Sequence, residues 1–102
     1  MKVAISSEGM NAESLLDSRF GRCTAFAIYD TETKALNFIE NPNKDADEGA
    51  GPASVSLVAN QGVKRIISGE FGFKIKGLLN DLKIEMDARK EKMSVADIIK
   101  QL

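Results

Sequence analysis

The sequence predicts an α/β fold, built on a five-stranded mixed sheet in the order 3-2-1-4-5 with helices packed on its faces. Two observations support this prediction. The first 40 residues contain three short apolar runs, whereas the later residues alternate apolar runs with helical patterns. Strands followed by strand–helix–strand units are typical of a sheet that is antiparallel on one side and parallel on the other. At 102 residues, we expect a single domain covering residues 1–102.

The antiparallel part of the sheet is expected to consist of residues 3–5, 25–29 and 36–40. The second of these runs is apolar on both faces, as in an internal strand, and the third alternates loosely, as in an edge strand. Only a short polar turn, residues 30–34, separates the second strand from the third, so the two must be antiparallel neighbours. The three runs therefore predict a meander in which strand 2 is antiparallel.

The second half of the chain alternates helices with strands. Pro52 is expected at the first position of a helix, where proline is favoured, and Gly62 marks the end of that helix. Strand–helix–strand units cross over in a right-handed sense and pair their strands in parallel. The remaining expected elements are a strand at residues 63–68, a helix through Ile75, Leu78 and Leu79, a strand at residues 82–86, and a short helix after the start signal Ser94-x-x-Asp97.

The charge of the chain limits its partners. It carries 14 basic and 15 acidic side chains, a formal net charge of −1, and so has no general attraction for phosphate backbones or anionic membranes. We therefore expect no nucleic-acid partner and no membrane partner. A single cysteine excludes an intrachain disulfide. Because the apolar run at the N-terminus is also too short for a signal peptide, we expect a cytoplasmic protein.

The chain contains no histidine. It therefore lacks the usual general base near neutral pH, the commonest nitrogen ligand of metals, and the central residue of Ser–His–Asp and Cys–His groups. The predicted first strand carries no carboxylate, which argues against two-metal cleavage of phosphodiesters. We predict no catalytic residues and a protein that is not an enzyme. An enzyme acting on a phosphorylated small molecule is the weakest alternative, with Glu8, Asp17, Glu48 or Glu70 as its base.

The strongest candidate for function is the segment of residues 17–23. It lies in a long connection, residues 10–23, in which we expect only a helical turn at residues 12–16. Unstructured loops of this length are uncommon in compact domains and are often functional. Arg19 and Arg22 provide charged, forked donors, so the loop is suited to binding an anion.

Two glycine turns, residues 49–51 and 69–72, are expected to meet this loop. Ligands of such sheets bind beyond the carboxyl ends of the parallel strands, where the chain order switches sides. Each glycine turn places free backbone N–H groups at a helix start, where the helix dipole favours an anion. The three segments together predict a receptor for a small anion.

Each of these segments also has a purely structural interpretation. Arg19 and Arg22 can instead pair with carboxylates on the surface, and the glycines can serve only to turn the chain. A lone cysteine such as Cys23 is more often a buried core residue than a ligand. The acidic run at residues 45–48 is interpreted as a solvated loop rather than a metal site.

Short motifs with consistent spacing run along almost the whole chain. They are Asp17-Ser18-Arg19-Phe20-Gly21-Arg22, which is the most specific, then Glu40-Asn41-Pro42, Gly49-Ala50-Gly51 before a helix, Gly62-Val63 and Gly69-x-x-Gly72. In these motifs the chain resembles the dinitrogenase iron–molybdenum cofactor biosynthesis family, which includes the NifX and NafY types, the C-terminal domain of NifB-type proteins and the orange protein. The resemblance implies a three-layer α/β/α fold of the ribonuclease H-like type. It also implies a carrier that holds a preformed, anionic metal–sulfur cofactor or its precursor.

The resemblance further implies a non-covalent site for a metal–sulfur cluster of the iron–molybdenum or molybdenum–copper type, and a protein partner in cofactor assembly. Cys23 is then the one candidate metal ligand. The alternative is a protein-interaction or regulatory module of the same fold that binds no cofactor and uses an exposed sheet edge and the turn at Phe71 and Phe73. The implied cofactor-binding residues are Arg19, Phe20, Gly21, Arg22, Cys23, Gly49, Gly51, Gly69 and Gly72.

Overall fold

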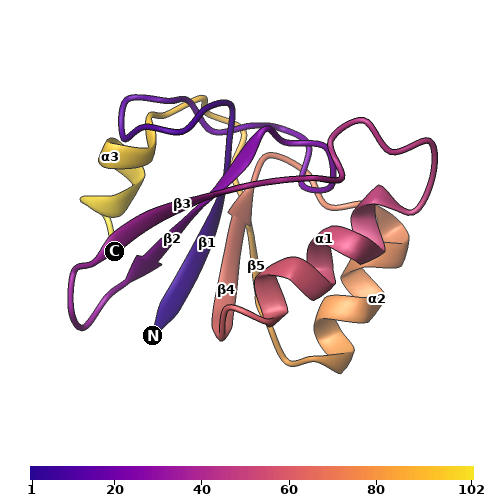
Figure 1. Cartoon of the computed structure of the whole chain (residues 1–102). Helices are drawn as coiled ribbons and strands as arrows, with labels where there is room; N and C mark the ends of the chain where they lie inside the picture. Colours follow the sequence, from indigo (N-terminus) through magenta and orange to yellow (C-terminus); the bar gives the residue numbers. More distant parts are fainter.

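The computed structural model describes residues 1–102 and is organised around one mixed sheet (Figure 1). The elements are, in chain order, β1 (Lys2–Ser7), β2 (Ala25–Asp30), β3 (Leu36–Glu40), α1 (Ala50–Ala59), β4 (Val63–Ser68), α2 (Phe73–Asp81), β5 (Glu85–Ala88) and α3 (Val95–Ile99). The strands lie in the order β3-β2-β1-β4-β5. β2 is antiparallel to β1 and to β3, whereas β4 is parallel to β1 and to β5. The predicted strand order and the antiparallel direction of strand 2 are confirmed.

Helices cover both faces of the sheet and so produce three layers (Figure 1). On one face, α1 and α2 bury Val55 and Ile75 against the sheet residue Ile66. On the other face, α3 buries Ile98 against Ile5. β1 is buried from Val3 to Ser7, as expected of a strand covered on both faces, whereas β4 is buried at Val63 and from Ile66 to Ser68 and exposes Lys64. No helix combines the length and the apolar character that a membrane crossing needs.

The predicted helical turn at residues 12–16 is wrong. Leu15 and Leu16 instead form isolated bridges, Leu15 with Ser94 and Leu16 with the end of β1. The backbone N–H of Leu16 donates to the carbonyl oxygen of Met93 at 2.8 Å, and the Leu16 side chain is only 2% exposed. Contacts with distant segments of the chain therefore determine the path of this loop.

Two element boundaries also differ from the prediction. Helix α1 begins at Ala50, so Pro52 is its third residue and not its first. Pro52 still lies in the first turn, where backbone N–H groups have no intrahelical acceptor, so the lack of an N–H on proline breaks no helix hydrogen bond. The last strand begins at Glu85 and not at Leu82, because Leu82 is the C-cap of α2 and its N–H donates to the carbonyl oxygen of Leu78 at 3.1 Å. Lys83 then adopts a φ of 58° and turns the chain toward β5.

Candidate functional site

The arginine loop, residues 17–23, is anchored at the carboxyl ends of β1 and β4. The N–H of Asp17 donates to the carbonyl oxygen of Ser6 at 2.8 Å, and the N–H of Gly69 donates to the carbonyl oxygen of Asp17 at 3.2 Å. The Asp17 side chain is buried, and its Oδ1 accepts a hydrogen bond from the N–H of Arg19 at 2.9 Å. The loop is thus fixed at both of the central parallel strands, which is the switch point of the sheet.

A hollow of about 380 Å³ lies between this loop and the first turns of α1 and α2. Of the nine predicted site residues, all except Cys23 and Gly69 line this hollow. A role of the lining residues in binding stays a prediction. Segments that are far apart in the sequence therefore meet around one space. The lining residues are Arg19, Phe20, Gly21, Arg22, Gly49, Ala50, Gly51, Glu70, Gly72 and Ile75.

Close backbone contacts bring the walls of the hollow together. A Cβ atom on Gly21 would lie 2.9 Å from the Cα of Gly51, and a Cβ atom on Gly51 would lie 2.5 Å from the Cδ1 of Ile75. The contact at Gly21 is with backbone atoms, so the loop approaches α1 more closely than other residues would allow. The contact at Gly51 is with the end of the Ile75 side chain, which would have to shift to admit a methyl group. These two glycines therefore shape the hollow.

Both helices that face the hollow begin without a side-chain cap. Gly49 is the N-cap of α1, with a φ of 74°, and Gly72 is the N-cap of α2; neither first turn contains an acidic residue. The N-terminus of α3 differs, because the Oγ of Ser94 accepts a hydrogen bond from the N–H of Asp97 at 3.1 Å, as the sequence predicts. The first N–H groups of α1 and α2 lack intrahelical partners and carry the positive end of the helix dipole.

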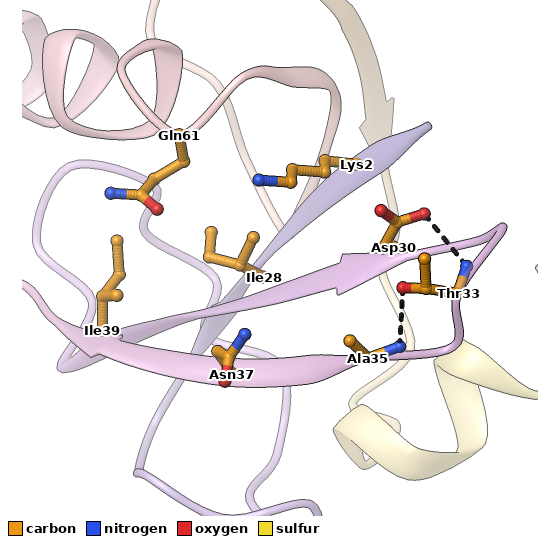
Figure 2. A pocket seen from close by; sticks show the side chains of 8 residues that line it. All are labelled: Lys2, Ile28, Asp30, Thr33, Ala35, Asn37, Ile39 and Gln61. Atoms are coloured by element: carbon orange, nitrogen blue, oxygen red, sulfur yellow. Dashed lines mark hydrogen bonds between the residues drawn. The ribbon is translucent and has the colours of Figure 1, made fainter.

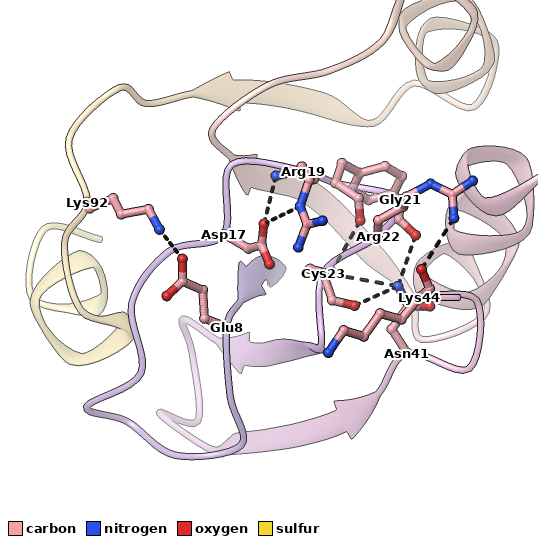
Figure 3. A network of polar contacts seen from close by, with 10 residues as sticks. Glu8, Asp17, Arg19, Gly21, Arg22, Cys23, Asn41, Lys44 and Lys92 are labelled. Carbon is pink, nitrogen blue, oxygen red and sulfur yellow. Dashed lines mark hydrogen bonds and ion pairs between the residues drawn. The ribbon is translucent and has the colours of Figure 1, made fainter. Parts of the chain in front are cut away.

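The two arginines have different partners. The Nη1 of Arg22 donates to the carbonyl oxygen of Lys44 at 3.3 Å (Figure 3). It also donates to the carbonyl oxygen of Ala46 at 2.6 Å and so holds the loop before α1. The Nε of Arg19 lies 3.4 Å from the Oδ1 of Asp17, yet its side chain is 60% exposed. This contact involves only the Nε of Arg19 and leaves both of its terminal nitrogens without a partner in the chain. Both guanidinium groups therefore keep N–H donors for a ligand.

The buried Asn41, which the sequence analysis names only within the motif Glu40-Asn41-Pro42 and not as a site residue, holds the arginine loop through hydrogen bonds. Its Nδ2 donates to the carbonyl oxygen of Gly21 at 3.1 Å and to that of Cys23 at 3.0 Å (Figure 3). The Oγ of Ser54, on α1, also donates to the Gly21 oxygen at 3.1 Å. An asparagine after a strand end is a common turn residue, so its sequence position alone does not indicate this role.

Glu70 introduces a negative charge at the hollow. It follows Gly69 directly, and its backbone forms an isolated bridge with Arg19. The sequence analysis considers Glu70 only as a base for the enzyme alternative. The other additional lining residues, Ala50 and Ile75, contribute apolar surface, and Ala50 could have been inferred from its place between two predicted glycines.

Cys23 lies in the core and not at the hollow. Its side chain is fully buried, and its Sγ donates to the carbonyl oxygen of Phe20 at 3.3 Å. Burial, together with the nearby Asp17 carboxylate, raises the pKa of the Cys23 thiol from 9.0 to about 12. A cysteine binds a metal as a thiolate, so metal binding by Cys23 would require loss of this proton and movement of Phe20. The role of Cys23 as a metal ligand stays a prediction. No three acidic or thiol side chains lie close enough together to hold a metal ion.

The burial of Cys23 predicts very slow alkylation of the native protein. At pH 8.5 the thiolate fraction is expected to be about a thousandfold lower than in the unfolded chain, because the folded pKa lies well above the unfolded one. Iodoacetamide labelling, followed by mass spectrometry with and without guanidinium chloride, measures the ratio of the two rates. Since the chain has one cysteine, the label reports this thiol alone. Equal rates in the two states would contradict the buried placement.

Comparison with known proteins places the chain among its relatives. The model of the dinitrogenase iron-molybdenum cofactor family matches residues 1–102. The uncharacterized protein MJ0580 of Methanocaldococcus jannaschii is 34% identical over 89 residues, which cover 84% of this chain and 72% of that protein.

Two solved structures have the same fold. The apo form of the orange protein from Desulfovibrio gigas has a TM-score of 0.91 and 26% identity, and the match covers 98% of this chain and 84% of that one. A NifB-like protein of the DUF35 family from Thermotoga has a TM-score of 0.83 and 31% identity, and the match covers 97% of this chain and 84% of that one. Because the family match spans every residue and the folds agree, this chain belongs to the dinitrogenase iron-molybdenum cofactor family.

Proposed function

We propose that this protein is a cytoplasmic carrier that holds an anionic metal–sulfur cofactor, or its precursor, non-covalently in the hollow. The observation that carries the proposal is the meeting of two uncapped helix N-termini with Arg19 and Arg22 around one space. Membership of the family supports the cofactor class. A cluster of the iron–molybdenum or molybdenum–copper type is the cargo that the family association favours.

The charge at the hollow supports an anionic ligand in spite of Glu70. Two guanidinium groups contribute two positive charges, and Glu70 and the Asp17 carboxylate beside Arg19 remove two. Each helix N-terminus adds roughly half a positive charge, so the sum is about +1. The attraction is strongest at low ionic strength, because the hollow is open to solvent.

Non-covalent binding also suits a carrier, because the cargo must be released. Backbone N–H groups and guanidinium groups can donate hydrogen bonds to sulfide or oxo groups at the surface of an anion. Holding the cargo through several such donors, and not through a thiolate ligand, allows transfer to a partner protein in cofactor assembly. In the hollow, Glu70 is the single carboxylate, and we assign the protein a binding role and no catalytic one.

Anaerobic incubation with molybdate, sulfide and copper or iron salts tests the proposal. A coloured complex that survives gel filtration is expected, with molybdenum measured by elemental analysis. The Arg19→Ala/Arg22→Ala variant is expected to bind about a hundredfold more weakly, since each charge-assisted hydrogen bond contributes about 1.5–3 kcal/mol. Glu70→Gln is expected to bind more tightly, because it removes the opposing charge.

The matched control is Arg65→Ala/Arg89→Ala. It makes the same change in net charge at two arginines that pair with Glu85 and Asp87, away from the hollow. This control should retain molybdenum as the unmodified protein does. A colourless protein that keeps no molybdenum, or equal retention by both double variants, would overturn the proposal.

A protein-interaction module without a cofactor is the second candidate function. Phe73, the first residue of α2, favours it, because its side chain is 91% exposed immediately beside the hollow. Exposed aromatic side chains of this kind are common anchors of protein interfaces. A stoichiometric partner that still binds Arg19→Ala/Arg22→Ala but is lost with Phe73→Ser would favour this function over the carrier.

A further inference from the structure

A second cavity, of about 220 Å³, lies at the opposite end of β1 from the hollow (Figure 2). It is bounded by the β2–β3 hairpin, the start of β1 and the turn after α1. Its volume is below the range of about 300–1,000 Å³ that is typical of sites for drug-sized ligands, which limits it to a small molecule. The lining residues are Lys2, Ile28, Asp30, Thr33, Ala35, Asn37, Ile39 and Gln61.

The floor of this cavity is apolar. Ile28 and Ile39 project from β2 and β3 into it, on the sheet face that α1 and α2 cover only in part (Figure 2). Ile28 belongs to the core beneath these helices, whereas Ile39 is half-buried at its margin. The surface left beside the helices is therefore suited to a short apolar group.

Three donor side chains surround this floor without partners in the chain. Lys2 and Asn37 are exposed and Gln61 is half-buried, and none of the three makes a side-chain hydrogen bond within the chain. Lys2 also forms no ion pair, although Asp30 is its cross-strand neighbour. In Figure 2 the Lys2 ammonium group extends toward Gln61 and away from Asp30. Asparagine is disfavoured within strands, and Asn37 lies exposed in the middle of the edge strand β3.

Asp30 supplies a negative charge at the other end of the cavity. Its Oδ1 accepts hydrogen bonds from the N–H groups of Glu32, at 2.9 Å, and Thr33, at 3.4 Å, so the carboxylate is fixed by the hairpin turn. The cavity thus presents an ammonium group and a carboxylate that are not paired with each other, above an apolar floor. This arrangement is complementary to a zwitterion with an apolar side chain.

We propose that this cavity binds a small free amino acid with an aliphatic side chain. Lys2 and Asn37 receive the carboxylate of the ligand, Asp30 receives its ammonium group, and Ile28 and Ile39 contact its side chain. Because the ligand is small and the cavity is open, the expected dissociation constant is on the order of 1 mM. The site is separate from the hollow and does not depend on the carrier function.

Titration of the ¹⁵N-labelled protein with L-leucine tests this proposal by NMR. The backbone amide signals of Lys2, Asn37 and Gln61 are expected to shift together. Two analogues each lack one charge: 4-methylpentanoate has no ammonium group, and isoamylamine has no carboxylate. Each analogue is expected to bind at least about tenfold more weakly, since a charge-assisted contact is lost. Equal binding of either analogue, or no shift at these amides with L-leucine, would overturn the proposal.

Variants locate the site independently. Lys2→Gln is expected to weaken L-leucine binding about tenfold, whereas Lys76→Gln, at an exposed lysine of α2 that does not line this cavity, should leave it unchanged. Asn37→Thr should also weaken binding while raising the melting temperature, because threonine is favoured in strands. Unchanged affinity in both Lys2→Gln and Asn37→Thr would also contradict the assignment.

Discussion

Gly69→Ala is expected to destabilise the protein by about 2–3 kcal/mol, although it adds a single methyl group. A Cβ atom at this position would lie 2.4 Å from the Cα of Ser18 and 3.1 Å from its carbonyl oxygen. Both are backbone atoms, so no side-chain rotation can relieve the clash. The arginine loop would have to move away from β4, breaking the hydrogen bond from the N–H of Gly69 to Asp17.

Urea unfolding followed by circular dichroism measures this effect. Gly77→Ala is the matched control, because it is the same substitution with nothing within 4 Å of the added Cβ atom. Gly77 lies within α2, where alanine is the better helix former, so the control should be stabilised by about 1 kcal/mol. If the two variants changed stability in the same direction, the close contact between residues 18 and 69 would be refuted.

Asn41→Asp is expected to destabilise the protein by about 3 kcal/mol or more. The substitution keeps the shape of the side chain but replaces the Nδ2 donor with an oxygen that faces the carbonyl oxygens of Gly21 and Cys23. Because Asn41 is only 3% exposed, the new charge would also be desolvated. The loss of stability should therefore diminish at acidic pH, where a protonated carboxyl group can donate one hydrogen bond.

Thermal and urea unfolding at pH 7 and pH 4 provide the measurement. Asn60→Asp, at an exposed position beyond the end of α1, is the control and should change stability by less than about 0.5 kcal/mol. A loss of stability in Asn41→Asp that is small, or that does not depend on pH, would argue against the hydrogen bonds assigned to Asn41.

The sheet could be predicted because its signals are local. The apolar run of β2 indicates an internal strand, and the short turn at residues 30–34 fixes the antiparallel pairing with β3. The path of Leu15 and Leu16 could not be predicted, since it depends on contacts with β1 and with Ser94, far along the chain. Helix α1 begins at Ala50, before Pro52, and the proline alone does not fix this boundary because its missing N–H is tolerated anywhere in the first turn.

The candidate site could be predicted in part for the same reason. The switch point of the sheet indicates where the arginine loop and the two glycine turns meet, and Arg19, Arg22, Gly49 and Gly72 do line one hollow. A glycine motif does not distinguish a binding residue from a packing one, however. Gly69 contacts the backbone of Ser18 and does not line the hollow.

The uncapped starts of α1 and α2 link occupancy of the hollow to folding. A serine or aspartate at these N-caps would stabilise each helix by about 1 kcal/mol relative to alanine. Glycine is less stabilising than serine or aspartate by only a few tenths of a kcal/mol, and it leaves the first N–H groups of the helix without a side-chain acceptor. An anion that binds the folded state alone would stabilise it through those same amides. Resistance to heat and to proteases should thus rise with loading, so that a filled molecule outlasts an empty one.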